Sequence, residues 1–187
     1  GQECGGGKLA NGGGGAYAGN TGAGGGGNGG TGGQGGNQYS GCNPVNKNGI
    51  GGLALTRANN HIYVGGGGGG PERDNNQTIF PGGNGGGLVY ITAGSVVGNN
   101  QTIVSNGDSV QTFGDEGGSG GGAGGSIYLV SPSFVGNLNV FADGGNGSDN
   151  FNTDSHISIL GSYALQITSV GSTDSITRKP AFFPVAI

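Results

Sequence analysis

The stretch GGNGGTGGQGGN at residues 26–37 repeats a Gly-Gly-X triplet without interruption, and glycine makes up 52 of the 187 residues of the chain. Glycine loses more backbone entropy on folding than any other residue, so helices and pleated strands gain little from it. A period of three residues matches the polyproline II backbone instead, whose N–H and C=O groups all point outward. Such helices can hydrogen-bond to one another where glycine lets their backbones come close. We therefore expect a bundle of polyglycine II helices rather than a flexible linker.

The remaining composition narrows the class of protein. Hydrophobic residues make up 31% and charged residues 9%, the net charge is −4, and the 6 prolines are too few for collagen. The 6 Lys and Arg residues are scattered and form no basic stripe, so we expect no nucleic-acid partner. No apolar run approaches the roughly 18–20 residues of a membrane span, so we expect no membrane insertion. The chain contains no Met and begins with Gly1, which predicts that a secretory leader has been removed and that the mature protein is extracellular or at the cell surface.

Two cysteines and three glycosylation sequons are consistent with a secreted protein. Cys4 and Cys42 flank the most glycine-rich part of the chain, where a disulfide would remove about 3–4 kcal/mol of unfolded-chain entropy. The alternative to a disulfide is a pair of buried thiols. A metal site is disfavoured, because the chain has neither a CxxC pair nor a nearby histidine to complete the ligands. The sequons predict N-glycosylation candidates at Asn76, Asn100 and Asn146.

An internal repeat organises the second half of the chain. Residues 89–99 (VYITAGSVVGN) match residues 127–137 (IYLVSPSFVGN) at an offset of 38, and after a one-residue slip residues 103–107 match residues 140–144. Each unit predicts a glycine tract, a strand, a short turn, a second strand and another glycine tract. The ranges 53–55 and 61–64 suggest a degenerate earlier copy, and 157–160 and 163–170 suggest closing strands. No stretch has the spacing and caps of an α-helix.

These patterns predict one mainly β domain over residues 1–187, with essentially no α-helix. We expect an antiparallel β-sheet or sandwich combined with the polyglycine II bundle. Residues 1–52 would be the disulfide-stapled, glycine-helix-rich part, residues 53–150 the repeated units, and residues 151–187 the C-terminal strands and an apolar tail.

A resemblance supports this architecture. The glycine run GGSGGGAGG at residues 117–125, followed by the strand-like SIYLVS at residues 126–131, resembles the glycine-rich repeats of secreted microbial surface and filament proteins. In its alternation of glycine runs and short strands it is similar to the polyglycine-helix domains of phage tail-tip adhesins and of some receptor ectodomains. The resemblance covers most of residues 1–150. It implies an architecture and a location outside the cytoplasm, and it transfers no functional residue.

One short motif suggests a metal. GGNGSDNFN at residues 144–152 fits the calcium-binding nonapeptide of parallel β-rolls, with Asn146 and Asp149 as the candidate ligands. These rolls bind calcium between successive turns, and no second copy of the motif follows. The alternative is a simple turn that begins at Asp143-Gly144. We therefore expect no metal or other cofactor.

The setting of each candidate catalytic residue indicates that the chain is not an enzyme. His61 and His156 flank apolar strand residues, which is typical of histidines at a strand edge. Asp108 could form an acid pair with Asp115 and Glu116, but the sequence FGDEGG around the last two is typical of solvated loop charges. Nothing in the sequence places a serine, a histidine and an acid together. We expect no catalytic residue.

The tyrosines offer a possible carbohydrate platform. Tyr63, Tyr90 and Tyr128 lie in apolar strand runs, however, so we expect them to be packed.

The C-terminal segment RKPAFFPVAI at residues 178–187 is apolar, and its two prolines exclude a helix. It would pack on its own subunit or add as a strand to the sheet of the next one, a mode called β-augmentation. The assembly side chains of this tail would be Phe182, Phe183, Val185 and Ile187.

Three function classes remain, in this order of preference. The first is a structural subunit of an extracellular filament or surface matrix, which forms a homopolymer through backbone pairing. The second is a receptor-binding adhesin of the phage tail-tip or cell-surface type, with glycans or a surface receptor as its partner. The third is an ice-binding protein, although the glycine array is interrupted more often than such proteins require.

Overall fold

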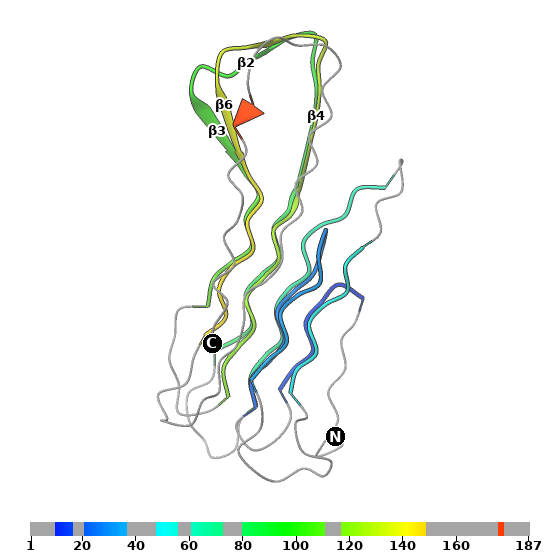
Figure 1. The fold of residues 1–187 in the computed structure, drawn as a ribbon, viewed down its shortest axis with the longest axis vertical. Helices are drawn as coiled ribbons and strands as arrows, with labels where there is room; N and C mark the ends of the chain where they lie inside the picture. The colour runs from blue at the N-terminus through cyan, green and yellow to red at the C-terminus, as the bar shows by residue number, and fades with distance from the viewer. Residues whose placement is uncertain are drawn as a thin grey trace.

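The structure, a computed structural model, describes residues 10–16, 21–36, 48–55, 61–72, 80–110, 117–148 and 176–177. Figure 1 shows an elongated body in which the strands gather at one end and the glycine-rich stretches run along the long axis below them. The described part of the chain contains strands and no helix, which confirms the expectation of a mainly β protein without α-helix.

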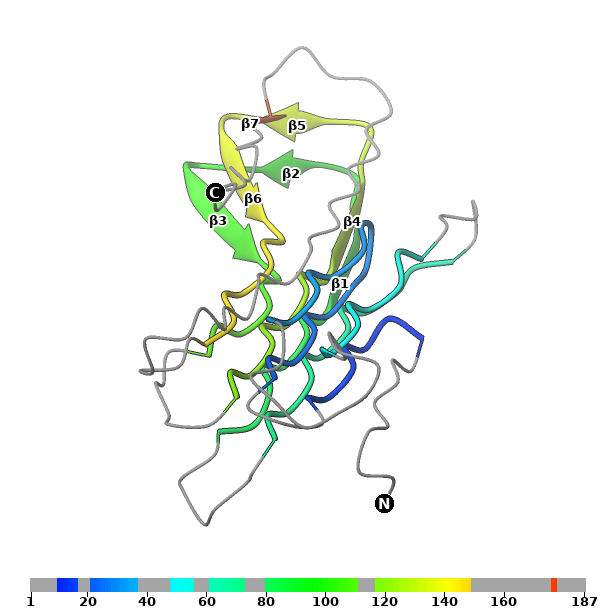
Figure 2. The same ribbon diagram turned by 60° about the horizontal axis from the view of Figure 1, so that its bottom comes forward.

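Two U-shaped coils form the strand-rich end (Figures 1 and 2). In each coil a long strand runs toward the end of the molecule, a short strand crosses that end, and a second long strand runs back. The two long strands are the arms of the coil. The first coil contains β1 (Leu88–Thr92), β2 (Val96–Val97) and β3 (Gln101–Val104). The second coil contains β4 (Ser126–Val130), β5 (Phe134–Val135) and β6 (Leu138–Phe141), and β7 (Ile176–Thr177) pairs with β6.

Every described strand pair is parallel, so the predicted antiparallel sheet is wrong. β1 pairs with β4, β2 with β5 and β3 with β6, each strand beside its counterpart in the other coil. Within one coil the two long strands do not pair, because they face each other across the apolar interior. The strands therefore stack by repeat rather than fold back as hairpins.

The register reproduces the sequence repeat. Tyr90 lies opposite Tyr128 at the offset of 38, whereas Ile103 lies opposite Val140 at an offset of 37. The offset changes by one residue at the corner after the short strand β2, where Asn99 and Asn100 adopt left-handed φ angles of 46° and 56°. The second coil turns the same corner with Gly136 at φ 71°. Asparagine and glycine are the residues that tolerate this conformation, and the first coil uses one residue more.

The apolar core lies between the two arms of the second coil. Alternate side chains of a strand point to the same face, so every second residue of β4 and β6 enters the space between the arms. The buried core residues are Ile127, Leu129, Phe134, Leu138, Val140 and Ala142. Their counterparts in the first coil are only partly buried and pack against them: Val89, Ile91, Val96 and Ile103.

The glycine-rich stretches form an array held by backbone hydrogen bonds. Stretch 21–28 donates to three different neighbours in turn and returns to the same neighbour every third residue. Gly22 and Gly25 donate to stretch 30–36, Ala23 and Gly26 to stretch 117–126, and Gly24 and Gly27 to stretch 10–16. Its carbonyls accept bonds from two more stretches, 48–55 and 61–70. Stretch 117–126 likewise bonds to five described neighbours: 21–28, 61–70, 80–87, 105–110 and 142–148.

Glycine is required in this array for space rather than for unusual torsion angles. Gly136 is the only described glycine with a positive φ, and it lies in the second coil. A Cβ atom added to Gly26 would lie 1.9 Å from the carbonyl oxygen of Gly66, which is far inside van der Waals contact. Ala23 and Ala123 are fully buried in the same array and mark positions where a methyl group fits.

The predicted earlier copy of the repeat is wrong. Residues 53–55 and 61–64 form no strand and instead continue stretches of the array. Leu55 N–H donates to the carbonyl of Asn28 at 2.6 Å, and Gly65 N–H donates to that of Gly86 at 2.8 Å. The predicted closing strands at 157–160 and 163–170 lie outside the described residues, as do Cys4 and Cys42 of the proposed disulfide.

Candidate functional site

The sequence-predicted site residues are only partly within the described structure. Cys4, Cys42, Asn76 and Asp149 lie outside it, as does the apolar tail with Phe182, Phe183, Val185 and Ile187. His156, Asp115 and Glu116 also lie outside it. Asn100 and Asn146 are exposed, which is compatible with their role as glycosylation candidates. Glycosylation itself stays a prediction.

The calcium candidate gains no support from the described residues. The backbone of Asn146 is part of the array: its carbonyl accepts a bond from Val110 N–H at 2.8 Å, and its N–H donates to Ser109 Oγ at 2.9 Å. Residues 142–148 therefore continue the array rather than form the alternative turn at Asp143-Gly144. Within the described ranges, no group of three or more His, Cys, Asp and Glu side chains could hold a metal ion.

A shallow, open depression lies at the far end of the glycine stretches from the coils. Its volume is about 280 Å³, and its lining residues are Phe80, Pro81, Gly82, Gly83, Asn84, Asp108, Ser109 and Val110. The exposed Asp108 carboxylate accepts a 2.9 Å bond from Asn84 Nδ2. One solvated acid bonded to one amide provides no acid–base pair, so this depression is a weak candidate site.

The first coil presents an unpaired edge, and this is the strongest candidate site. Among the described strands β1 pairs only with β4, and β3 pairs only with β6. Ala93 N–H donates to the carbonyl of Val130, and Ser126 N–H donates to the carbonyl of Gly87, both at 3.0 Å. Because bonding alternates along a strand, the odd-numbered residues of β1 direct their backbone groups toward β4. The even-numbered residues direct theirs toward the open edge.

The even-numbered residues of β1 are Leu88, Tyr90 and Thr92. The same alternation applies to β3, because Ser105 N–H donates to the carbonyl of Phe141 at 2.8 Å. Thr102 and Val104 therefore direct their backbone groups away from β6. The open edge thus extends over both arms of the first coil, on the side away from β7 (Figure 2).

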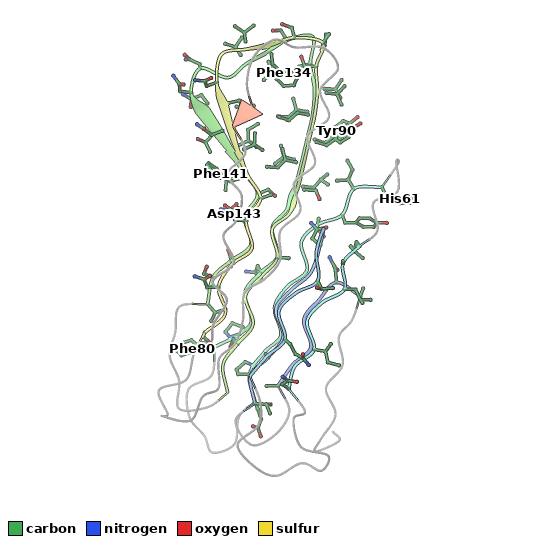
Figure 3. All side chains as sticks on the ribbon, viewed as in Figure 1. His61, Phe80, Tyr90, Phe134, Phe141 and Asp143 are labelled. Atoms are coloured by element: carbon green, nitrogen blue, oxygen red, sulfur yellow. The ribbon has the colours of Figure 1, made fainter. Side chains whose placement is uncertain are left out.

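Two rows of matching side chains end at this edge. The rings of Tyr90 and Tyr128 stack with centroids 5.2 Å apart and planes at 6° (Figure 3). Tyr90 is nevertheless 58% exposed, so the expectation that it is packed is wrong. In the second row, Asn137 Nδ2 donates to Asn100 Oδ1 at 3.4 Å. The amide nitrogen of Asn100 donates no bond within the described residues.

The edge also carries exposed apolar side chains, and the segment that forms it contains no charged residue. Leu88, Val97 and Val104 are 45%, 67% and 55% exposed. The sequence from Phe80 to Gly107 contains no Asp, Glu, Lys, Arg or His. Natural sheets normally protect a free edge with charges, prolines or bulges along the strand, and β1 and β3 have no charge or proline.

Sequence reasoning did not identify this edge. The repeat of 38 residues predicted that two units stack, and the uncharged range 80–107 was visible in the sequence. What the sequence did not show is which of the two units lies at the end of the stack.

The chain was compared with known protein families, with characterised proteins and with solved structures, and none of the three comparisons found a match. Membrane-spanning helices are absent from the part of the chain that the structure describes.

Proposed function

We propose that this protein is a structural subunit of an extracellular filament or surface matrix, built on polyglycine II helices and assembled by backbone pairing between subunits. The observation that carries the proposal is the glycine array, in which stretches 21–28 and 117–126 each bond to five neighbouring stretches. Such a body is held together by peptide groups rather than by a large apolar core.

The assignment of polyglycine II helices rests on the hydrogen-bond period. A polyproline II backbone has three residues per turn, so its successive N–H groups point in three directions. Stretch 21–28 has this pattern, since its N–H groups reach three neighbours in rotation. The tight Cβ environment of Gly24, Gly26 and Gly27, each with a backbone atom within 2.4 Å, is what close packing of such helices requires.

The side-chain hydrogen bonds within the array support a structural role. The buried polar side chains of the array join stretches to one another: Asn28 Nδ2 donates to the carbonyls of Gly124 and Gly125, and Ser126 Oγ donates to that of Tyr63. We propose that the chain has no catalytic activity and needs no cofactor. The resemblance to glycine-rich microbial surface proteins supports a location outside the cell.

The test compares the chain of residues 1–187 with a variant that lacks residues 180–187. Sedimentation velocity and negative-stain electron microscopy over a range of concentrations measure assembly. We expect the intact chain to form polymers and the truncated chain to remain a folded, secreted monomer. Circular dichroism and the Tm of the truncated chain are the control for folding. An intact chain that stays monomeric at high concentration in its native medium refutes the proposal.

One observation favours a receptor-binding adhesin as the second candidate. His61 and Tyr63 stack with ring centroids 6.1 Å apart and planes at 10°, and His61 is exposed. Figure 3 shows His61 on the same side of the molecule as Tyr90. Exposed aromatic rings with a polar edge suit recognition of sugars. Binding of the purified chain to a glycan array, lost in a Tyr90→Ala variant, would favour this candidate over the filament subunit.

A further inference from the structure

We infer that the open edge of the first coil is a strand-acceptor surface whose occupant is an extended strand of a second copy of this chain. The inferred strand runs parallel to β1 and places an aromatic ring over Tyr90. This inference rests on the proposed function, because it names the surface through which one subunit receives another.

The backbone of β1 defines the type of occupant. Leu88, Tyr90 and Thr92 direct their N–H and C=O groups to the open edge, and no described strand pairs with them there. Unpaired backbone groups in a row form a template for one more strand. A strand that adds to an existing sheet obtains its affinity from these bonds and its specificity from alternate side chains.

The orientation follows from the two side-chain rows. Among the described residues Tyr90 is the last ring of its row, and Tyr128 covers only one of its faces. Asn100 is the last amide of its row, with an unused amide nitrogen among the described contacts. A parallel strand in register extends the aromatic row, as β4 does on the other side of β1. An antiparallel strand would keep the backbone bonds but lose this match.

The difference in burial between the two coils shows what the occupant supplies. Ile127 and Leu129 of β4 are fully buried, whereas their register partners Val89 and Ile91 in β1 are only partly buried. A strand on the open edge would cover the outer side of Val89 and Ile91. It would therefore need apolar residues on either side of its aromatic residue.

The absence of charge argues against a polyelectrolyte and suits a second copy of this chain as the partner. The range 80–107 contains no charged residue, so a nucleic acid or an acidic polymer would find no counter-charge along the edge. Two copies with net charge −4 would repel through charged faces, whereas the segment that forms this edge contains no charged residue. The sequence pattern that fits the edge already occurs in the chain as Ile127-Tyr128-Leu129.

The experiment uses the full chain and a fluorescent peptide with the sequence of residues 125–131, GSIYLVS, as a model of the incoming strand. Thr92→Pro removes an edge-directed N–H without removing a bond to β4, and strand edges tolerate proline. Thr92→Val is the matched control because it keeps the N–H. Thr102→Pro makes the corresponding change in β3. Fluorescence polarisation measures peptide binding, and sedimentation velocity measures assembly of the same proteins.

We expect the peptide to bind the wild-type chain and Thr92→Val equally, and Thr92→Pro at least about tenfold more weakly. A peptide carrying Tyr128→Ser should also bind about tenfold more weakly, because it cannot stack on Tyr90. Assembly should decrease in Thr92→Pro and Thr102→Pro and persist in Thr92→Val. The Tm of each variant shows whether it is folded.

Two results separate the inference from the proposed function. If the wild-type chain assembles but binds no peptide, and Thr92→Pro and Thr102→Pro assemble normally, the inferred acceptor edge is wrong while the proposed function stands. If the wild-type chain binds the peptide but stays monomeric at every concentration, the proposed function is wrong, and a second copy is not the occupant.

Discussion

Substitution of adjacent glycines by alanine tests whether space, rather than backbone torsion, requires glycine in the array. A Cβ added to Gly66 would lie 1.8 Å from the carbonyl oxygen of Asn11, whereas a Cβ added to Gly67 meets nothing closer than the carbonyl oxygen of Gly83 at 3.5 Å. Neither glycine has a positive φ. The two variants Gly66→Ala and Gly67→Ala therefore differ in the space available and share the same stretch.

The expected effects have opposite signs. In Gly66→Ala the neighbouring stretch must move by more than about 1 Å to restore ordinary contact. This movement strains the bond from Gly66 N–H to the carbonyl of Gly27 and the bond from Ala123 N–H to the carbonyl of Gly66, at 3.0 and 2.9 Å. The overpacking and the weakened bonds together should cost about 3–5 kcal/mol of unfolding free energy. Gly67→Ala should instead stabilise by about 0.4–1 kcal/mol, because alanine restricts the unfolded chain.

Thermal unfolding followed by circular dichroism measures both variants. For a chain of this size we expect the Tm of Gly66→Ala to decrease by about 10 °C and that of Gly67→Ala to increase by a few degrees. Gly70→Ala, where the added Cβ has open space, is a second control. Equal Tm values for Gly66→Ala and Gly67→Ala would refute the close packing of these stretches.

Three further predictions concern side chains and charge. Asn28→Ala should lower the unfolding free energy, measured by chemical denaturation, by about 2–3 kcal/mol, because the buried amide donates to the carbonyls of two glycines at 2.9 and 3.2 Å. Asn137→Ala removes only an exposed 3.4 Å bond and should change the unfolding free energy by less than about 0.5 kcal/mol. Leu129→Ala should cost about 2–5 kcal/mol, and Ile91→Ala on the paired strand β1 less, since Leu129 is fully buried and Ile91 is not; equal losses would contradict an open first coil. The Tm should change little between low and high NaCl concentrations, because backbone bonds rather than ion pairs hold the array together.

The sequence predicted the elements of the fold better than their pairing. The offset of 38 and its one-residue slip correspond to the register of Tyr90 with Tyr128 and of Ile103 with Val140. Parallel and antiparallel strands have the same alternation of apolar residues, however, so periodicity alone could not distinguish them. The deciding fact is that each strand pairs with its repeat, and repeats of one unit stack in the same direction.

Burial was the property that the sequence predicted least well. Tyr90 and Tyr128 occupy equivalent positions in their repeats, yet Tyr90 is mostly exposed and Tyr128 is half-buried. Leu53 and Val64 have the residue types of strands but are 44% and 56% exposed on stretches of the array. Position within a stack is a property of the whole molecule, so equivalent residues in two repeats can have different surroundings.

The array contains stretches that lead into neither coil, so the array and the described sheet end at different places. Stretch 80–87 leads into β1, and stretch 117–126 leads into β4; Gly86 N–H donates to the carbonyl of Ala123 just as the strands above them pair. On its other side, stretch 80–87 is bonded to stretch 61–70, through Gly65 N–H to the carbonyl of Gly86 and Gly68 N–H to that of Gly83.

The array therefore continues past the first coil, whereas the described sheet does not. An additional coil of the same kind would have to place its own glycine stretches where stretch 61–70 already lies. A single extended strand needs only the edge of β1 (Leu88–Thr92), to which stretch 61–70 makes no backbone bond among the described residues. The geometry thus favours addition of a strand over stacking of a complete coil, and residues added at the N-terminal end of the probe peptide should not strengthen its binding.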